Sequence, residues 1–588
     1  MIVPMKKAVV IMQGKDSFNA LAALRELGIL HLEFERPVKS KNINDLLEEL
    51  QLLNQVLNIL AEVRIGSGMV FVGEESGNVE VNVRQIIDLF KRKTQLTEHL
   101  QVLTAQIKDY EIWGDFDPQD FVSLAEKNIF AGLFQIPVGQ LNRLPEDIVV
   151  SKLSIKGGIA NCLIISRNKI EIGFKEISLP QIGLLNMRRR RDEDTRVIKD
   201  LQRQLLDQVR YLGILNKIKL DLQKDLDFQE ALSGMSQAES LSYISGYLPF
   251  DNVERLMYRA KQERWALRIS EPQAEDNVPV LLRNPKWIAV INPIFKFLEI
   301  LPGYYELDIS LPFLIFFSIF FGMLIGDAGY GIVYFLITLL LHRRAIKLKR
   351  STRSFFLFYI LSFCAIIWGL CTGTFFGHDW VMQTGYKPLI PALNNEKTLQ
   401  RLCFLIGAVH LSLAHIWRAI LKFPALNMLA DIGWTAILWA CFFIARVLIL
   451  GDLFPPFAKI LLIAGIFLVI IFTNPQRNII KGIGEGLGTL ALSFVNNFTD
   501  VVSYIRLFAV GLAGVAIADA FNAMAFSAGN AHIFNLILAG FIILLGHSLG
   551  VILGPVGVLV HGVRLNVLEF SSHAGISWSG QNYKPFKK

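Results

Sequence analysis

Two arginines lie inside long apolar stretches of the C-terminal half of this sequence. Arg506 is about midway along FVNNFTDVVSYIRLFAVGLAGVAIA, and Arg564 is in VGVLVHGVRLNVLEF. A charged side chain at membrane depth costs about 2.5 kcal/mol or more, so it normally faces water or a partner. Because arginine keeps its proton in proteins, it can repel cations and lower the pKa of a carboxylate that moves past it. The sequence therefore predicts an ion gate, with Arg506 as the stronger candidate and Arg564 as the second.

Polar side chains accompany both arginines. Ser503, Thr499 and Asn496 lie three, seven and ten residues before Arg506, so in a helix they share its face and could line a hydrated path. The other candidate lining residues are Asp500, Asp519, His547, His561 and Glu569. A structural reading stays open, in which the arginines reach the membrane interface or form hydrogen-bonded pairs, and the two aspartates cap or pair locally.

No other chemistry is indicated. The cluster GIGEGLG (482–488) lacks the Gly/Lys/Thr pattern of a Walker motif and fits close helix packing better. None of the five cysteines has the spacing of a metal site or a disulfide framework. The net charge of +8 comes without a nucleic-acid recognition motif, and much of it lies in short loops between apolar runs. We therefore expect no nucleotide site, no cofactor, no metal and no nucleic-acid partner.

The composition divides the chain into two regions. Of the 588 residues, 52% are hydrophobic, which is too apolar for a soluble protein of this length. Charges recur every few positions up to about Ser310, whereas long apolar runs dominate from Leu311 onward. These runs are about 311–341, 354–377, 401–421, 430–450, 457–473, 485–526 and 532–570. Since a span needs roughly 20 residues, region 311–588 is expected to be an α-helical polytopic membrane domain.

The charges between the runs predict how the chain crosses the membrane. The N-terminus has no signal peptide, and the basic loop HRRAIKLKRSTR (342–353) belongs in the cytoplasm. The run 311–341 must then cross twice, as a hairpin of short helices that turns near Gly326 to Gly331. The remaining six runs alternate with Lys422, Arg477 and Lys481 inside, which gives about eight helices and cytoplasmic N- and C-termini. The last two runs are long enough to be strongly tilted.

The first 310 residues are predicted to form a cytoplasmic α+β dumbbell. KAVVIM, a helix near 17–27 and GILHLEFE predict a lobe near 1–42. Leucines and isoleucines at three- and four-residue intervals predict two helices, about 43–112 and 192–232, paired as a long antiparallel coiled coil. Strand-like stretches, with the strand–helix–strand pattern of SYISGYLPFDNVERLMYRAKQERWALRISEP, predict a far lobe within 113–275. Segment 276–310 then joins the dumbbell to the membrane.

Several motifs together resemble one known family. They are FGMLIGDAGYG (321–331), GTFFG (373–377), DVVSYIRLFAVGLA (500–513), LVHGVRLNVLEF (559–570) and the ending NYKPF (582–586). In this order and spacing they resemble subunit I, also called subunit a, of the V-type and A-type ATPases. The membrane half matches nearly end to end, whereas the first 240 residues match by layout alone. The length resembles that of bacterial and archaeal members, which implies the cell membrane of a prokaryote.

The resemblance implies a stator protein that is not catalytic alone but belongs to an ATP-driven complex that moves protons or sodium ions. It would offer two offset aqueous half-channels to a rotating ring of proteolipid (c/K) subunits, with Arg506 matching the family's essential arginine and Arg564 its second one. The dumbbell would hold the peripheral E/G-type stalks and touch central-stalk subunits of the C/d type, so that the A/B catalytic head stays fixed. Eukaryotic relatives carry a histidine and a glutamate where this chain has Gly514 and Gly554, so the half-channels must be lined differently.

Two other classes of function compete with this reading. A secondary transporter also has many helices and rare buried charges, but it usually shows internal repeats, and we see none. A membrane scaffold with structural arginines would not explain the polar face around Arg506 within an apolar helix. The sequence leaves open whether the ion is H⁺ or Na⁺, and whether the complex mainly makes or mainly hydrolyses ATP.

Overall fold

The protein is described by a computed structural model that covers most of the chain. The described residues are 1–34, 40–67, 82–145, 148–169, 172–377, 385, 387–473, 479–528 and 533–588. They form two compact units. One unit consists of Met1–Ile11, Leu27–Glu33 and Ser245–Lys587, and the other mainly of Met12–Glu26 and Phe34–Ile244.

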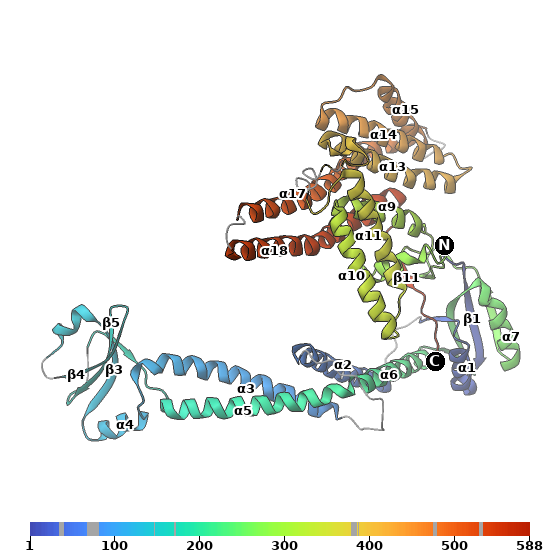
Figure 1. Ribbon diagram of the computed structural model, residues 1–588. Coiled ribbons are helices and arrows are strands. Elements are labelled where there is room, and N and C mark those ends of the chain that lie inside the picture. Colours follow the sequence, from blue (N-terminus) through green and yellow to red (C-terminus); the bar gives the residue numbers. More distant parts are fainter. Residues whose placement is uncertain are drawn as a thin grey trace. The chain divides into compact units, whose positions relative to one another are not determined.

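Four long helices form the arm of the second unit (Figure 1). They are α2 (Lys41–Ser67), α3 (Val83–Tyr110), α5 (Leu184–Gln208) and α6 (Leu212–Ser233). Helix α3 packs along α5, and α2 packs along α6, through buried apolar residues. Since α3 leads into the lobe at the end of the arm and α5 leads out of it, these two helices run in opposite directions. The coiled coil itself stays a prediction.

The helix bounds differ from those expected for the arm. Residues 68–81, expected within the first helix, lie outside the described residues. The second helix starts earlier than expected, because Leu184 and Met187 are buried in the cluster that holds Leu103 of α3. It is interrupted by a 3-10 turn at Val209–Tyr211, just before Gly213, and glycine is a common site of helix kinks.

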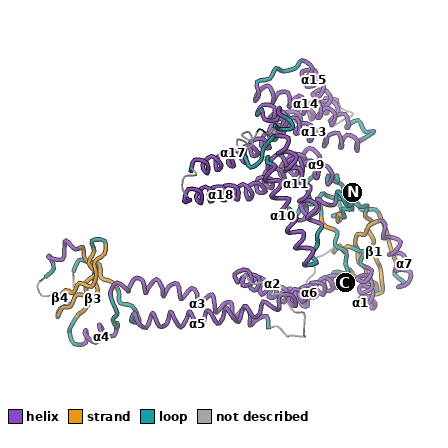
Figure 2. The backbone as a smooth tube through the Cα atoms, in the orientation of Figure 1, coloured by secondary structure: helices purple, strands orange, loops and turns teal. Residues whose placement is uncertain are grey.

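The lobe at the end of the arm contains an antiparallel sheet in the order β4-β5-β3-β6, visible as the strands beside α4 (Pro118–Glu126) in Figure 2. Its strands are β3 (Phe130–Pro137), β4 (Val149–Lys156), β5 (Ile159–Ser166) and β6 (Lys175–Ile177). Phe134, Ile136 and Ile164 are buried on one face, where residues alternate in and out of the core as strand geometry requires.

A second sheet corrects the expected division into lobes. Its strands are β1 (Met5–Gln13), β2 (His31–Glu33), β8 (Leu241–Pro249) and β9 (Ala266–Ser270), in the order β2-β8-β1-β9, with the short β7 (Ser236–Ala238) on β8. Helices α1 (Ser17–Leu27) and α7 (Val253–Glu263) connect them. The sequence pattern predicts that the segment from β8 to β9 belongs to the far lobe. It pairs instead with the N-terminal strands, for example Val9 with Arg268, because local alternation marks a strand but cannot select its partner.

The joining segment is tied to the C-terminal tail. Strand β10 (Pro279–Val280) pairs in parallel with β11 (Gln581–Asn582), and α8 (Asn292–Phe297) follows. The backbone N–H of Tyr583 donates to the carbonyl of Val280, and that of Phe586 donates to the carbonyl of Leu30. The ending NYKPF therefore returns to the residues that begin the soluble half.

The membrane half is helical. Its helices are α9 (Ser310–Ile325), α10 (Ala328–Lys347), α11 (Arg353–Thr372), α13 (Glu396–Lys422), α14 (Met428–Leu450), α15 (Pro456–Phe472), α16 (Ile479–Ser503), α17 (Ile505–Ser527), α18 (Ile533–Gly557) and α19 (Ser571–Ala574). Among the described residues, five helical stretches are long and apolar enough to cross a membrane, or six if the bent pair α9–α10 is one span. The shorter α15 is also apolar. Several helices are thus candidates to cross a membrane, whereas the count of eight stays a prediction; Arg477 lies outside the described residues.

The break between α9 and α10 lies where the sequence predicted a turn. The helix axes differ by 119° at this point. Gly326 has a φ of 68°, a left-handed conformation that glycine adopts without steric cost, and it ends α9. The carboxylate of Asp327 then caps α10 by accepting a hydrogen bond from the N–H of Tyr330 at 3.1 Å. Thr374 holds the turn because its hydroxyl donates to the Gly326 carbonyl.

Candidate functional site

Arg506 is positioned by a break between two helices. Helix α16 ends at Ser503 and α17 begins at Ile505, so the Ser503 carbonyl is free to accept a 3.0 Å hydrogen bond from Nε of Arg506. Tyr504, at the break, is fully buried, and its hydroxyl lies 2.8 Å from Nδ1 of His410 on α13. Its ring also packs against Gly407, where a Cβ would not fit. The buried tyrosine therefore fixes the point at which the arginine leaves the helix.

One carboxylate lies between the two arginines. Oε1 of Glu569 lies 2.8 Å from Nη2 of Arg506 and 3.5 Å from Nε of Arg564. The Glu569 side chain is only 5% exposed, whereas those of Arg506 and Arg564 are 24% and 55% exposed. The site thus has two fixed positive charges, a single negative charge, and one arginine that points largely out of the chain.

Irregular helix geometry places Arg564 and Glu569 together. The chain after α18 forms two π-helical turns, Val558–Gly562 and Leu565–Phe570. Residues five apart diverge around an α-helix, but the i→i+5 bonding of a π turn brings them to one side. π turns are frequent at functional sites.

A polar cavity of about 370 Å³ lies on one side of this site. Its polar lining residues include His415, Arg418, Lys422, Asp431, Asn496, Asn497, Asp500 and His573. Asp431 is buried and lies 2.6 Å from Nζ of Lys422 and 3.5 Å from Nε of Arg418. The two imidazoles bond to each other, with Nε2 of His415 at 2.8 Å from Nδ1 of His573, and Nε2 of His573 lies 3.0 Å from Oδ2 of Asp500. Ionisable groups thus follow one another along the cavity wall.

A second polar cluster lies further along α17. Tyr330 on α10 bonds through its hydroxyl to Nδ1 of His547 at 2.9 Å, and Nε2 of that histidine lies 3.2 Å from Oδ1 of Asn522. The amide nitrogen of Asn522 donates to the Phe376 carbonyl at 2.6 Å. Asp519 lies beside them, close to Gly377. An adjacent hollow of about 720 Å³ is lined mainly by apolar residues of α18, together with His547.

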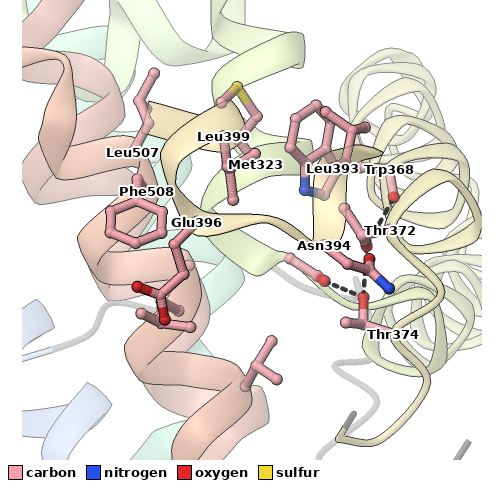
Figure 3. A pocket seen from close by; sticks show the side chains of 14 residues that line it. Met323, Trp368, Thr372, Thr374, Leu393, Asn394, Glu396, Leu399, Leu507 and Phe508 are labelled. Atoms are coloured by element: carbon pink, nitrogen blue, oxygen red, sulfur yellow. Dashed lines mark hydrogen bonds between the residues drawn. The ribbon is translucent and has the colours of Figure 1, made fainter. Parts of the chain in front are cut away.

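A third, smaller cavity lies beside the first turns of α17 (Figure 3). It measures about 100 Å³ and is lined by apolar side chains such as Trp368, Leu507 and Phe508. Its polar groups include the carboxylate of Glu396 and the hydroxyl of Thr372, which bonds to that of Thr374 at 2.8 Å. An apolar wall of this kind makes a poor path for an ion.

The candidate residues from the sequence fall into separate groups. Arg506, Arg564, Ser503 and Glu569 come together, since Oγ of Ser503 lies 3.5 Å from Oε1 of Glu569. Asn496 and Asp500 line the polar cavity, whereas Asp519 and His547 belong to the second cluster. Thr499 is exposed, and His561 is partly exposed in the first π turn.

Sequence reasoning missed the histidine pair and its charged neighbours. His415, Arg418 and Asp431 lie in or beside apolar helices, and ionisable residues at membrane depth are functional candidates by default. That signal was present. What the sequence did not contain was the pairing of His415 with His573, 158 residues away. Within the described ranges, no three His, Cys, Asp or Glu side chains group as a metal site.

Gly514 and Gly554 have different surroundings. A Cβ on Gly514 would meet open space, whereas one on Gly554 would lie 2.8 Å from both Cδ1 of Ile325 and Oη of Tyr334. Contacts below 3.0 Å force a neighbour to move. The tyrosine hydroxyl, which donates to the Val551 carbonyl, therefore occupies space that a larger side chain at Gly554 would need.

The fold and the site define a polytopic membrane protein with a large soluble α+β half and a paired arginine–carboxylate centre. No family model matches the chain. It is 31% identical to the V-type ATP synthase subunit I of Borreliella burgdorferi over 621 residues, covering 100% of both chains. It is 30% identical to V-type ATP synthase subunit I 1 of Treponema pallidum over 648 residues, again covering 100% of both. The chain belongs to the subunit I family of the V-type and A-type ATP synthases.

More distant relatives include archaeal proteins. The A-type ATP synthase subunit I of Methanocaldococcus jannaschii is 27% identical over 402 residues, which are 61% of this chain and 56% of that protein. A solved structure titled as the cytoplasmic N-terminal domain of subunit I of V-ATPase matches 45% of this chain and 100% of its own at 14% identity, with a TM-score of 0.22, too low to support an argument. The similarity to the Borreliella, Treponema and Methanocaldococcus proteins identifies the chain as a membrane subunit of a rotary ATPase, as the sequence motifs predicted.

Proposed function

We propose that this chain is the stator subunit that provides two half-channels for ions, with Arg506 and Arg564 as the gate between them. The observation that carries the proposal is the shared carboxylate of Glu569, which holds both guanidiniums in one place. A carboxylate that arrives on a moving partner meets fixed positive charge there, so it is favoured in its ionised form and releases its ion. Beyond the arginines it can be neutral again and reload.

An exposed apolar face beside the arginines supports a membrane partner. In the most apolar 18 residues of the stretch Ile533–Ala574, only 11% of the residues are buried. The corresponding share in α11, α13 and α14 is 33% to 50%. Helix α18 packs along α17, and Arg564, more than half exposed, lies just beyond α18. The proteolipid ring would cover this face and bring its carboxylates to the arginines.

Polar regions on both sides of Arg506 support two separate paths. Asp500, which lines the polar cavity, comes before Arg506, and Asn522, which belongs to the second cluster, comes after it. At a helical rise of ~1.5 Å per residue, they lie about 9 Å and about 24 Å from Arg506 along the helix. Lys422 lines the cavity, and the positive-inside rule assigns that residue to the cytoplasmic side. The cavity would then open to the cytoplasm, and the cluster with His547 and Asp519 to the opposite side.

The position of the C-terminal tail supports an even number of membrane crossings. Because Tyr583 bonds to Val280 and Phe586 bonds to Leu30, the chain before α9 and the chain after α19 lie on the same side of the membrane. That requires an even number of crossings. Counting α9 and α10 as separate crossings and α15 as a short one gives eight, with both termini in the cytoplasm of a prokaryotic cell.

The soluble half would carry the mechanical contacts. A ring that turns against the membrane half exerts torque on it, so the stator must be held from outside the membrane. We propose that the arm and its lobe bind the peripheral E/G-type stalks and touch the central stalk at a C/d-type subunit. The A/B catalytic head would be held indirectly through those stalks.

The test is ATP-driven ion uptake into vesicles that carry the whole complex, with wild type beside Arg506→Ala. Co-purification with the ring and stalk subunits is checked first. Arg446→Ala is a matched control, because Arg446 also lies near one end of an apolar helix and pairs with a carboxylate, that of Asp452, but does not contact Glu569. We expect Arg506→Ala to abolish uptake with assembly intact and the control to retain it. Retained uptake in Arg506→Ala would leave this chain as a scaffold.

A further inference from the structure

The histidine pair at the polar cavity has the connectivity of a proton relay. Nε2 of His415 lies 2.8 Å from Nδ1 of His573, whose Nε2 lies 3.0 Å from Oδ2 of Asp500. The imidazole of His573 therefore uses its two nitrogens on different neighbours. A neutral imidazole carries one N–H donor and one acceptor nitrogen, so this geometry fits Nε2–H on both rings.

The first histidine presents its second ring nitrogen at the cavity. Nδ1 of His415 is buried and has no hydrogen-bond partner among the described residues, and it lies 3.6 Å from Oδ1 of Asp431. Asn497 also lines the cavity, and its Nδ2 has no hydrogen-bond partner among the described residues. Buried polar atoms of this kind are normally satisfied by ordered water, and a polar cavity of about 370 Å³ has room for it. Water can therefore deliver a proton to Nδ1 of His415.

The other end of the relay, at Asp500, reaches the gate. The hydroxyl of Ser503 donates to the Asp500 carbonyl at 2.7 Å and lies 3.5 Å from Oε1 of Glu569, which holds Arg506. The remaining oxygen of Glu569 is buried and has no partner among the residues that are described. Water between Asp500 and this oxygen would complete the connection.

The groups around the cavity favour a proton over a metal cation. Arg418 and Lys422 from α13 both approach Asp431 from α14, and Asp500 lies beside His573, so both carboxylates of the cavity already have partners. Sodium ions prefer oxygen ligands, as hard cations do, and would meet these paired carboxylates and two imidazoles. A proton can pass through the imidazoles themselves.

We propose that this chain conducts H⁺ rather than Na⁺, and that His415, His573 and Asp500 relay the proton between the polar cavity and Arg506. Nδ1 of His415 gains the excess proton of a hydronium ion in the cavity, which becomes water, while its Nε2–H passes to Nδ1 of His573. The Nε2–H of His573 then passes to the carboxylate of Asp500. One proton has moved, each imidazole is left as the other tautomer, and ring reorientation restores the start. The reverse order moves a proton back.

The relay rests on the proposed function, so its test must separate the two. Vesicles that carry the complete complex are assayed for ATP-driven H⁺ uptake with a pH-sensitive dye and for ²²Na⁺ uptake. His573→Gln keeps a hydrogen-bonding side chain that cannot relay a proton, and His415→Gln serves if that variant does not assemble. His342→Gln is the matched control, because His342 on α10 bonds to Tyr359 away from the cavity.

We expect wild type to take up H⁺ and no ²²Na⁺, and His573→Gln to slow H⁺ uptake about a hundredfold, the scale of a lost proton-transfer group. His573→Ala should recover part of its rate when free imidazole is added, which a merely structural loss would not do. ATP-driven ²²Na⁺ uptake would overturn the proton assignment, and normal uptake in both glutamine variants would overturn the relay. If Arg506→Ala keeps uptake, the gate fails instead, whatever the histidine variants do.

Discussion

Removing the carboxylate of Glu569 is the most direct test of the paired-arginine centre. Glu569→Ala leaves Arg506 with the Ser503 carbonyl but without its 2.8 Å partner, in a site where the glutamate is 5% exposed. Breaking a buried ion pair costs about 3 to 5 kcal/mol. Because the Arg506 side chain is 24% exposed and retains one acceptor, we expect the lower end, about 3 kcal/mol.

The assay is unfolding of the purified chain by denaturing detergent, from which the free energy of unfolding is obtained. A double-mutant cycle with Arg506→Ala isolates the pair, and the double variant should lose clearly less than the two single losses combined. Asp452→Ala is the control. Its partners Arg401 and Arg446 are 42% and 30% exposed, and Asp452 itself is 15% exposed, so its effect should be smaller. A loss below about 1 kcal/mol in Glu569→Ala, the value of an exposed pair, would refute the buried centre.

Two further predictions concern packing and pH. Gly369→Val should prevent assembly, because even a Cβ would lie 2.0 Å from the backbone N of Ala328, and co-purification with the ring measures this. Burial raises the pKa of Glu306, but hydrogen bonds from Ser577 and the N–H of Gly303 outweigh it, so the folded pKa is lowered. Its contribution to stability is therefore full above the unfolded value of about 4.3 and is lost as the pH falls towards the folded pKa. Limited proteolysis of the tail should show weakening below about pH 4.3 in wild type and no such step in Glu306→Gln.

Much of the fold could be predicted because it is encoded locally. The apolar runs are long enough to span a bilayer, and the GDAG sequence contains both the glycine that ends α9 and the aspartate that caps α10. The two arginines stood out because charge is costly in an apolar helix. These signals need only a few neighbouring residues.

The rest depends on contacts between distant parts of the chain. The pairing of β8 with β2 and of β9 with β1, and the addition of β11 to β10, join strands whose own patterns fit many partners. The interruption of helix geometry lies at Tyr504, which makes a buried contact with His410, 94 residues away. The relay pair His415 and His573 is likewise invisible until α13 packs against α19.

The return of the tail to the soluble half has a consequence for how the protein is made. A ribosome releases the residues of β11 only after every membrane helix has been synthesised, yet β11 is the partner of β10, which emerged long before. The hydroxyl of Tyr583 reaches the Ile29 carbonyl across 554 residues. The first part of the protein to emerge is thus among the last to be completed. A chain that is cut short anywhere in its membrane half would leave β10 unpaired, and quality control in the cell could recognise that unfinished edge.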